Sequence, residues 1–332
     1  MEYIIAVDAM GGDDAPASVI EGAKAALDAY PDIALRVYGP KELLRDLEGV
    51  ERLTVCDAPE VITMHDSPML AVRSKANSSL VQAMLAVRSG QAGAVVSAGS
   101  TGAVLAGGMF RLGRIEGIDR PALTVVLPGR KKPYLLLDCG ANVDCQASYL
   151  NQFGLMGSVY MQKVLHVESP EVCLLNIGTE AEKGNRLVKE AHQLMMQQNV
   201  YRFAGNIEAR DTPEGLCDVV VADGFDGNLM LKHNEGLARA LMGMLKDEMM
   251  ASPRCKLGAL LLKPAFRAFK LKMSYQEYGG APLLGVKGSV IKAHGSSDAT
   301  AIKNAIRQAR IMLEGDVAKR IAQGVAALSR KE

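Results

Sequence analysis

The chain lacks tryptophan, has aromatic residues at only 5% of its positions, and contains no apolar run near the ~20 residues that a membrane-spanning helix needs. An excess of one charge is also missing. With 38 Lys and Arg against 37 Asp and Glu, the formal net charge is +1, and nothing global points to a nucleic-acid partner. The N-terminus enters an apolar run directly, without the pattern of a signal peptide. We therefore expect a cytosolic globular protein.

Six cysteines are present, but no two have the Cys-x-x-Cys spacing of a redox or zinc motif. Several lie in apolar runs, where a free thiol packs as a small hydrophobic side chain. The sequence therefore predicts neither disulfides nor a metal site. The six positions are Cys56, Cys139, Cys145, Cys173, Cys217 and Cys255.

What the chain does have is one local design that occurs four times: a short apolar run, a turn of small and polar residues, then helical sequence. In its first copy, Ile4–Val7 lead through Asp8, Gly11 and Gly12 to Pro16. Glycines let the backbone approach a ligand, and free N–H groups at a helix start attract anions. One such turn alone would be ordinary turn chemistry. In a parallel sheet, however, such exits gather at the carboxyl ends of the strands, which predicts one active-site crevice. The other copies span 95–102, 135–144 and 219–228.

A nicotinamide-dependent dehydrogenase is the obvious competing interpretation. It would need Gly-x-Gly-x-x-Gly after the first strand and an acidic residue at the end of the next one. Neither is present, because the second apolar run ends in Val37-Tyr38-Gly39-Pro40. We therefore expect no nucleotide cofactor.

Apolar, β-branched runs alternate with helix-length segments, which predicts a layered α/β/α fold with a largely parallel sheet. No flexible linker divides the chain, so we expect residues 1–332 to form a single α/β catalytic unit. Expected strands cover 3–7, 35–38, 53–56, 94–97, 123–127, 134–138, 172–177, 201–204 and 218–222. Expected helices cover 16–29, 77–89, 100–112, 147–164, 184–198, 226–250 and 298–313.

Residues 229–275 differ in composition from the rest and predict a projecting amphipathic helical hairpin. Between Arg254 and Lys272 there are six basic residues and no acidic one. Such a segment could lie on an anionic membrane surface or bind an acidic protein. It could equally pack at a dimer interface with a solvated basic face. The candidate contact residues are Arg254, Lys256, Leu260, Leu261, Lys263, Phe266, Arg267 and Lys270.

Three further segments hold candidate polar side chains. Between residues 66 and 79, two cations and two hydroxyls precede a helix and could clamp phosphate, or could form a solvated basic turn. Lys183 follows another strand and could neutralise an oxyanion. His294 lies among glycine and serines in the polar turn 292–298. The residues of the first segment are Arg73, Lys75, Ser78 and Ser79.

Together these motifs resemble the PlsX family, the phosphate acyltransferases of bacterial phospholipid synthesis, over nearly the whole chain. Family members convert acyl-acyl carrier protein and inorganic phosphate into acyl phosphate. The matching segments are 8–16, 73–79, 97–102, 117–122, 138–144, 176–185, 205–211, 223–228, 278–281 and 292–298. One departure is Asp14, where histidine is frequent in relatives, so position 14 is given no role.

The resemblance implies an isocitrate-dehydrogenase-like or phosphotransacetylase-like fold, a homodimer, no metal, and peripheral association with the inner face of the membrane through the hairpin. It also implies acyl carrier protein as a partner and a downstream glycerol-3-phosphate acyltransferase. We favour direct attack of phosphate on the thioester. Five methionines could form flexible walls for the acyl chain, although core packing is expected for most of them. They are Met230, Met242, Met244, Met249 and Met250.

The site that this mechanism needs has a phosphate cradle and groups for the oxyanion. Lys183, Asn228 and His294 are the catalytic candidates. Asp8, Asp138, Asn142 and Asp223 are expected near the substrate, with the aspartates holding lysines and N–H groups rather than acting as bases. The cradle candidates are Gly11, Gly12, Arg73, Lys75, Ser78, Ser79, Gly99, Ser100, Thr101 and Gly102.

Two alternatives remain at this point. A phosphotransacetylase-type enzyme would use acyl-CoA and ignore acyl carrier protein. A membrane scaffold without enzymatic activity would explain the basic hairpin but leave the polar strand exits without purpose.

Overall fold

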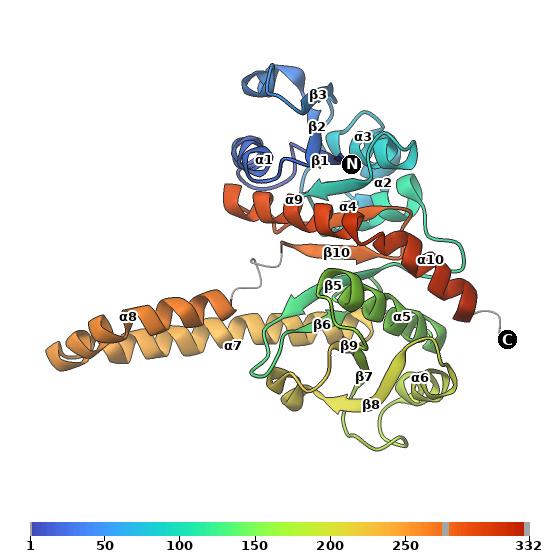
Figure 1. Ribbon diagram of the computed structural model, residues 1–332, viewed down its shortest axis with the longest axis vertical. Helices are drawn as coiled ribbons and strands as arrows, with labels where there is room; N and C mark the ends of the chain where they lie inside the picture. The colour runs from blue at the N-terminus through green and yellow to red at the C-terminus, as the bar shows by residue number, and fades with distance from the viewer. Residues whose placement is uncertain (1, 274–278, 329–332) are drawn as a thin grey trace.

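A computed structural model describes residues 2–273 and 279–328, with the side chains of 270–273 left out (Figure 1). Its centre is an eleven-stranded sheet in the order β3-β2-β1-β4-β11-β10-β5-β6-β9-β7-β8. Helices cover both faces of this sheet, so the predicted layered α/β fold is confirmed. The strands are β1 (Tyr3–Asp8), β2 (Ile33–Gly39), β3 (Leu53–Asp57), β4 (Ala94–Ser97), β5 (Ala122–Leu127), β6 (Tyr134–Leu137), β7 (Glu171–Asn176), β8 (Arg202–Glu208), β9 (Val219–Val221), β10 (Ala281–Leu284) and β11 (Ser289–Lys292).

The helices lie in two layers because alternate residues of a strand point to opposite faces of the sheet. In β1, Ile5 and Val7 pack in the apolar layer of α1, α5, α6, α9 and α10, whereas Ala6 packs in the layer of α2, α3 and α4. The helices are α1 (Ala17–Ala29), α2 (Pro68–Ser74), α3 (Ser79–Arg88), α4 (Thr101–Gly107), α5 (Ala147–Val164), α6 (Arg186–Gln197), α7 (Gly224–Met250), α8 (Pro253–Met273), α9 (Ala299–Glu314) and α10 (Val317–Leu328). A π-helical turn, η3 (Gly108–Leu112), continues α4, and short 3-10 turns are η1 (Lys41–Leu43), η2 (Arg45–Leu47) and η4 (Ala209–Glu214).

The sheet consists of two parallel blocks that run in opposite directions. Strands β3, β2, β1, β4 and β11 are parallel to one another, and so are β6, β9, β7 and β8. Between the blocks, β11 pairs antiparallel with β10, β10 with β5, and β5 with β6. Three reversals separate β11 from β6, so the carboxyl ends of the two blocks point to opposite ends of the sheet. The expectation that all four strand exits meet at one edge is therefore wrong.

The sequence analysis did not predict two of the strands, β10 and β11, or two of the helices, α2 and α10. The two strands are four residues each, and β10 contains Pro282, which weakens any strand prediction. They form because each is hydrogen-bonded to a strand on both sides, a long-range effect that local sequence does not show. The expected helix at 100–112 is also split, since its last five residues form the π-helical turn.

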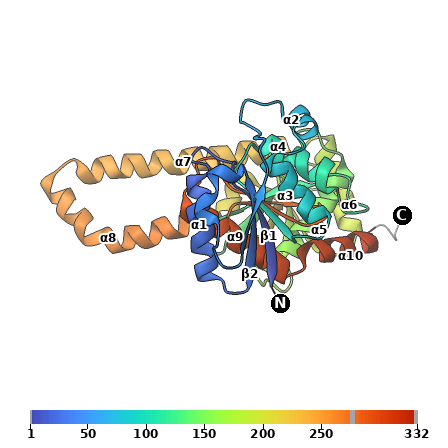
Figure 2. The same cartoon turned by 90° about the horizontal axis from the view of Figure 1, so that it is seen from above.

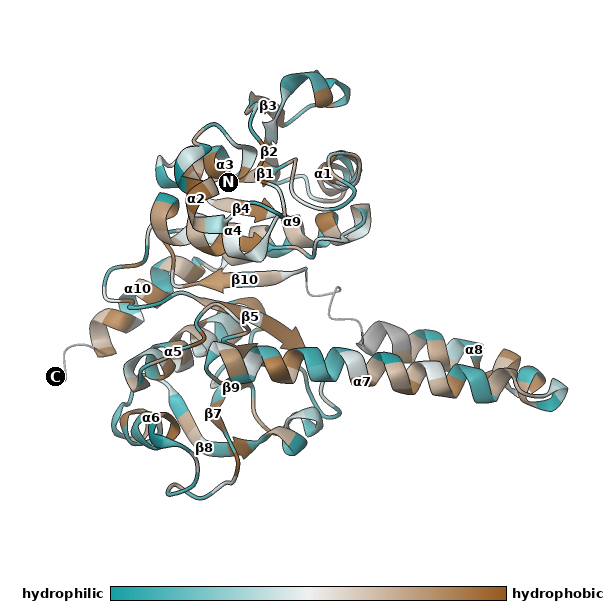
Figure 3. Cartoon of the chain, turned by 180° about the vertical axis from the view of Figure 1, so that it is seen from behind, coloured by the Kyte–Doolittle hydropathy of each residue, from teal (hydrophilic) through white to brown (hydrophobic). Residues whose placement is uncertain are grey.

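Helices α7 and α8 project from the body as a hairpin (Figures 1 and 2). The hairpin was predicted for 229–275, and residues 274 and 275 lie outside the described part of the chain. Apolar and polar residues alternate along both helices (Figure 3). Of the five methionines, only Met230 is buried, whereas Met242, Met244 and Met250 are exposed, so core packing was the wrong expectation for most of them. No helix in the described ranges has both the length and the apolar character to cross a bilayer.

The start of α7 is held so closely against the end of β6 that only glycine fits at position 227. A Cβ there would overlap the carbonyl oxygen of Asp138. We predict that Gly227→Ala lowers the free energy of unfolding by about 3 kcal/mol or more, because backbone on both sides would have to move. The control is Gly236→Ala in the same helix, where a Cβ meets nothing within 4 Å. It should stabilise by about 0.5–1 kcal/mol. Urea unfolding of both variants measures this, and equal stabilities would contradict the packing.

Candidate functional site

The exits of β1, β4 and β11 lie against one another at one side of the sheet centre. Gly11 packs on the backbone of Gly99, and the Asp13 N–H donates to the Gly295 carbonyl at 2.7 Å. Gly12 has a φ of +112°, which a residue with a side chain rarely adopts, and a Cβ there would lie 3.1 Å from the Gly295 oxygen. These three loops therefore lie in close backbone contact with one another.

Asp8 holds this group of loops together from within. Its carboxylate accepts hydrogen bonds from the Ser97 hydroxyl at 2.7 Å and from the Met10 N–H at 3.2 Å, and Ser79 hydrogen-bonds to it as well. Ser97 Oγ in turn accepts from the Gly99 N–H at 3.1 Å. Burial raises the pKa of Asp8, against the lowering effect of these hydrogen bonds and of Lys292. The carboxylate is occupied by the protein, as expected of an anchor rather than a base.

Asp138 holds together the loops that follow β6 and β9, as Asp8 does for the loops that follow β1 and β4. It accepts from the N–H groups of Leu123, Ala141 and Asn142 at 2.9, 3.1 and 2.7 Å and from the Asn142 side chain at 2.9 Å. Burial raises its pKa to about 6 despite these bonds. The Asn142 carbonyl then accepts from Gly224 N–H at 2.7 Å, and Asp223 caps α7 through the N–H groups of Phe225 and Asp226. These contacts place Asn228 beside Gly140.

A cleft of about 470 Å³ lies between the two groups of loops, over the face of β10 and β5. Thr101 and Gly102 at the start of α4, Asn228 on α7, and His294 after β11 all line it. The structure therefore brings together candidates from three of the predicted exits and from the polar turn 292–298. Apolar lining comes from Leu105, Leu123, Val125, Leu231 and Ala281, so one cleft offers both polar and apolar walls.

His294 is exposed in this cleft and held in one orientation by Ser296. The Ser296 N–H lies 3.2 Å from His294 Nδ1, and the Ser296 hydroxyl lies 2.9 Å from the same atom. Because the backbone N–H must donate, Nδ1 is the acceptor and the neutral ring carries its proton on Nε2. His294 can therefore offer an N–H donor to an oxygen in the cleft.

Lys292 lines the same cleft, although the sequence analysis gave it no role. Only 8% of it is exposed. Burial lowers its pKa to about 8, while the charges of Asp8 and Asp13 oppose that shift. The signal in the sequence was a lysine closing the apolar run 289–292.

In the segment 66–79, the side chains that were predicted to clamp phosphate contact other groups of the protein instead. Lys75 Nζ lies 2.7 Å from an Asp66 carboxylate oxygen and 2.9 Å from the Val61 carbonyl, and this contact lowers the pKa of Asp66 to about 2. The Arg73 guanidinium lies 5.7 Å from the Phe110 ring centre. Ser78 and Ser79 are buried, and the Ser78 hydroxyl donates to the Lys75 carbonyl at 2.8 Å. Sequence spacing shows which cations are near a helix start, but not which already have partners.

Lys183 lies apart from Asn228 and His294. It is exposed in the loop after β7, and the next residues, Gly184 and Asn185, line a different hollow of about 910 Å³. The residues of α7 that line this hollow, such as Leu229 and His233, lie on the opposite side of the helix from those that line the cleft. The three catalytic candidates therefore do not meet: Asn228 and His294 line the cleft, and Lys183 lies near the other hollow.

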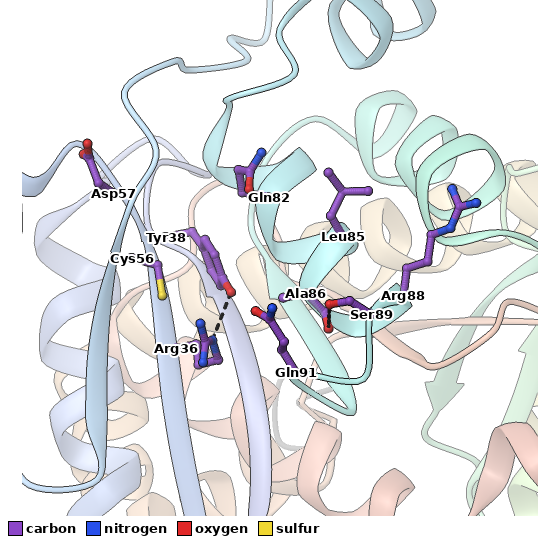
Figure 4. A pocket seen from close by; sticks show the side chains of 10 residues that line it. All are labelled: Arg36, Tyr38, Cys56, Asp57, Gln82, Leu85, Ala86, Arg88, Ser89 and Gln91. Atoms are coloured by element: carbon purple, nitrogen blue, oxygen red, sulfur yellow. Dashed lines mark hydrogen bonds between the residues drawn. The ribbon is translucent and has the colours of Figure 1, made fainter.

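A third hollow, of about 560 Å³, lies at the edge of the sheet between β2, β3 and α3 (Figure 4). It contains Arg36, whose Nε donates to the Tyr38 hydroxyl at 3.1 Å, together with Arg88 and two glutamines. None of its lining residues is a predicted site residue. The candidate site is therefore the central cleft, where several predicted residues meet.

Comparison with known proteins identifies the family. A family model described as "Fatty acid synthesis protein" matches residues 3–320. The chain belongs to this family. It is 51% identical over 331 residues to a "Phosphate acyltransferase" of Clostridium botulinum (strain Loch Maree / Type A3), with 98% of both chains covered. It is 48% identical over 333 residues to a "Phosphate acyltransferase" of Alkaliphilus oremlandii, with 99% of both covered. The resemblance to the PlsX family is thus confirmed over the whole chain.

Solved structures agree with the fold. A phosphotransacetylase from Streptococcus pyogenes matches with a TM-score of 0.64 at 16% identity, covering 94% of each chain. A branched-chain phosphotransacylase from Enterococcus faecalis matches with a TM-score of 0.56 at 16% identity, covering 94% of this chain and 99% of the other. At this level of identity the likeness shows the fold alone, and it confirms the predicted phosphotransacetylase-like architecture.

Proposed function

We propose that this member of the fatty acid synthesis family transfers the acyl group of long-chain acyl-acyl carrier protein to inorganic phosphate, forming acyl phosphate. One observation carries the proposal: Thr101, Gly102, Asn228 and His294 line one cleft in a chain 51% identical to a protein named phosphate acyltransferase. The acyl phosphate would supply a glycerol-3-phosphate acyltransferase in phospholipid synthesis.

The reaction we propose is a direct attack without an acyl-enzyme. A phosphate oxygen bonds to the thioester carbonyl carbon, and the carbonyl oxygen becomes an oxyanion. Collapse of this intermediate breaks the carbon–sulfur bond and releases the carrier thiol. That thiol has a pKa of about 8.5 by analogy with cysteine, so it leaves with little acid assistance.

The cleft supplies the two kinds of groups that this reaction needs. Backbone N–H groups of Thr101 and Gly102, at the start of α4, would hold phosphate. Asn228 and the Nε2 proton of His294 would donate to the oxyanion. The first carbons of the acyl chain would lie along Leu105, Leu123 and Leu231. Asp8 and Asp138 hold the loops at the ends of β1 and β6 in place through hydrogen bonds.

We also propose that the α7–α8 hairpin contacts acyl carrier protein, an anionic membrane surface or a second copy of the chain. A groove of about 1,080 Å³ between its helices combines apolar and basic residues, including Leu260, Phe266, Lys256, Lys263 and Arg267. Leu260 and Leu261 are 65% and 74% exposed, an unusual exposure for leucines unless something covers them. Arg254 is exposed on the same helix, and the side chain of Lys270 lies outside the described part. A homodimer at the inner face of the membrane would use this surface.

The assay that tests the activity measures release of free carrier thiol from long-chain acyl-acyl carrier protein, with the product trapped by hydroxylamine as a hydroxamate. We expect release to require phosphate and to yield trappable acyl phosphate. Turnover with acyl-CoA and none with the carrier protein would instead indicate a phosphotransacetylase. No turnover with either substrate would contradict the proposed activity.

We predict that Asn228→Ala lowers turnover by about 100-fold, because one donor to the oxyanion contributes on this scale. The melting temperature should stay unchanged, since the side chain of Asn228 is exposed. The matched control is Lys189→Ala, an exposed residue three positions into α6 that does not line the cleft. Full activity of Asn228→Ala would remove this residue from the mechanism.

Charge reversal on the hairpin should separate membrane binding from chemistry. We expect the triple variant Lys256→Glu, Lys263→Glu and Arg267→Glu to lose binding to anionic vesicles in a flotation assay, because each basic residue contributes about 1 kcal/mol near anionic lipid. Thermal stability should not change, since all three are exposed. A control triple variant at Lys189, Lys319 and Arg320 changes the same charge on the body. Vesicle binding that survives in the hairpin variant would contradict its role as the anchor.

A further inference from the structure

We propose that Lys292 binds the inorganic phosphate directly, as the cation of a cradle whose other donors are backbone N–H groups. This inference rests on the proposed acyl transfer to phosphate and names the residue that recognises the phosphate. It assigns to a lysine on the cleft floor the role that sequence spacing had given to Lys75.

The position of Lys292 is fixed by the sheet rather than by a loop. It is the last residue of β11, where it pairs with Ser97 of β4 on one side and with Ala281 of β10 on the other. One strand further, Asp8 follows Val7, which pairs with Val96. Asp8, Ser97 and Lys292 therefore form a row across three adjacent strands, on the same face of the sheet. A side chain in such a row is held in place better than one on a flexible loop.

Ser97 separates the carboxylate of Asp8 from the ammonium of Lys292. Neighbouring strands lie about 4.8 Å apart, so Ser97 stands between Asp8 and Lys292, which are two strands apart. In agreement, the Ser97 hydroxyl donates to Asp8 at 2.7 Å, and no salt bridge joins Lys292 to a carboxylate within the described ranges. Asp8 and Asp13 thus act on Lys292 only through their charge, which favours its protonated form.

The ammonium of Lys292 has three N–H donors, and its one hydrogen bond to the described residues goes to the Ala293 carbonyl. A buried charge without a partner is costly, so proteins pair such groups with an opposite charge. A phosphate dianion in the cleft supplies that charge and accepts the remaining donors. Lys75 offers the contrast, because Asp66 and Val61 already occupy its ammonium.

The test compares Lys292→Met with wild type by calorimetry with inorganic phosphate and by the KM for phosphate. Methionine keeps the length and most of the volume of lysine but removes the charge. We expect the Kd and the KM for phosphate to rise by between about 10-fold and 100-fold, the range for one hydrogen bond to a charged group. The KM for the acyl carrier substrate should stay within about twofold. Lys287→Met, an exposed lysine in the turn before β11, is the matched control and should behave as wild type.

A second variant adds a pH signature. The groups that face Lys292 are Asp8, Asp13 and His294, with the Lys232–Glu235 ion pair across the cleft. Because the pKa of Lys292 is lowered to about 8, its charge is present at pH 7 and is lost as pH rises through 8. Phosphate affinity of the wild type should fall over that interval. In Lys292→Arg the charge persists, so the fall should disappear.

A measurement on the unmodified protein covers the case in which the variants do not fold. Trinitrobenzenesulfonate labels neutral amines, and peptide mass spectrometry can follow Lys292 and Lys287 in the same sample. Phosphate should slow the labelling of Lys292 but not that of Lys287.

The outcomes separate this inference from the proposed function. Wild-type protein that neither turns over the carrier substrate nor binds phosphate would overturn the proposed function. Wild-type turnover with unchanged phosphate affinity in Lys292→Met, or equal labelling of Lys292 with and without phosphate, would overturn the role of Lys292 alone.

Discussion

The antiparallel pairing of β10 with β5 is the constraint on which the rest of this structure depends. It joins two parallel blocks whose carboxyl ends point in opposite directions. In a single parallel sheet, the loops that follow the strands would all lie at one edge. Here one set of loops approaches the sheet centre from each side, and the cleft forms over the short strands between them. The middle of the chain and its last third must therefore fold together before the site exists.

Within that cleft, the protein uses buried charge in two different ways. Asp8 and Asp138 are fully engaged by serine hydroxyls and backbone N–H groups, so they stiffen the loops at the ends of β1 and β6. Lys292 is buried as well, yet its ammonium has one protein acceptor among the described residues. Occupied carboxylates and an incompletely satisfied cation together favour an anionic ligand. An acyl acceptor such as phosphate has the charge that this environment lacks.

Sequence alone predicted much of this fold, and the reasons are physical. Continuous apolar runs such as 94–97 and 219–221 were predicted as strands, because a strand that is covered on both faces has apolar residues at every position. The hairpin was also predicted, since Arg254 to Lys272 has a composition that no buried core tolerates. Strands β10 and β11 were not predicted, because Pro282 interrupts the strand pattern of β10 and both strands pair with strands far away in the chain. Because those strands create the antiparallel pairings at the sheet centre, the opposite directions of the two parallel blocks were not predicted either.

The candidate site was predictable to a similar degree. Glycine and small polar residues after strands identified the loops at Gly11, Gly99 and Gly140, since close backbone approach leaves a clear local pattern. The sequence has no comparable local pattern that shows which acidic group a lysine will contact. Nothing in the spacing of Lys75 indicated that its ammonium would contact Asp66. Likewise, the position of Lys292 in the sequence did not indicate an ammonium with a single acceptor among the described residues. Which charges stay free is decided by tertiary contacts.

A crystal structure with a bound phosphate analogue would show where this protein holds its anion. Arsenate has the shape and charge of phosphate, and anomalous scattering locates its arsenic atom in a crystal. We expect one strong peak in the cleft, between the start of α4, Lys292 and His294. A peak only in the hollow of Arg36 and Arg88, or only in the hollow beside Lys183, would contradict it.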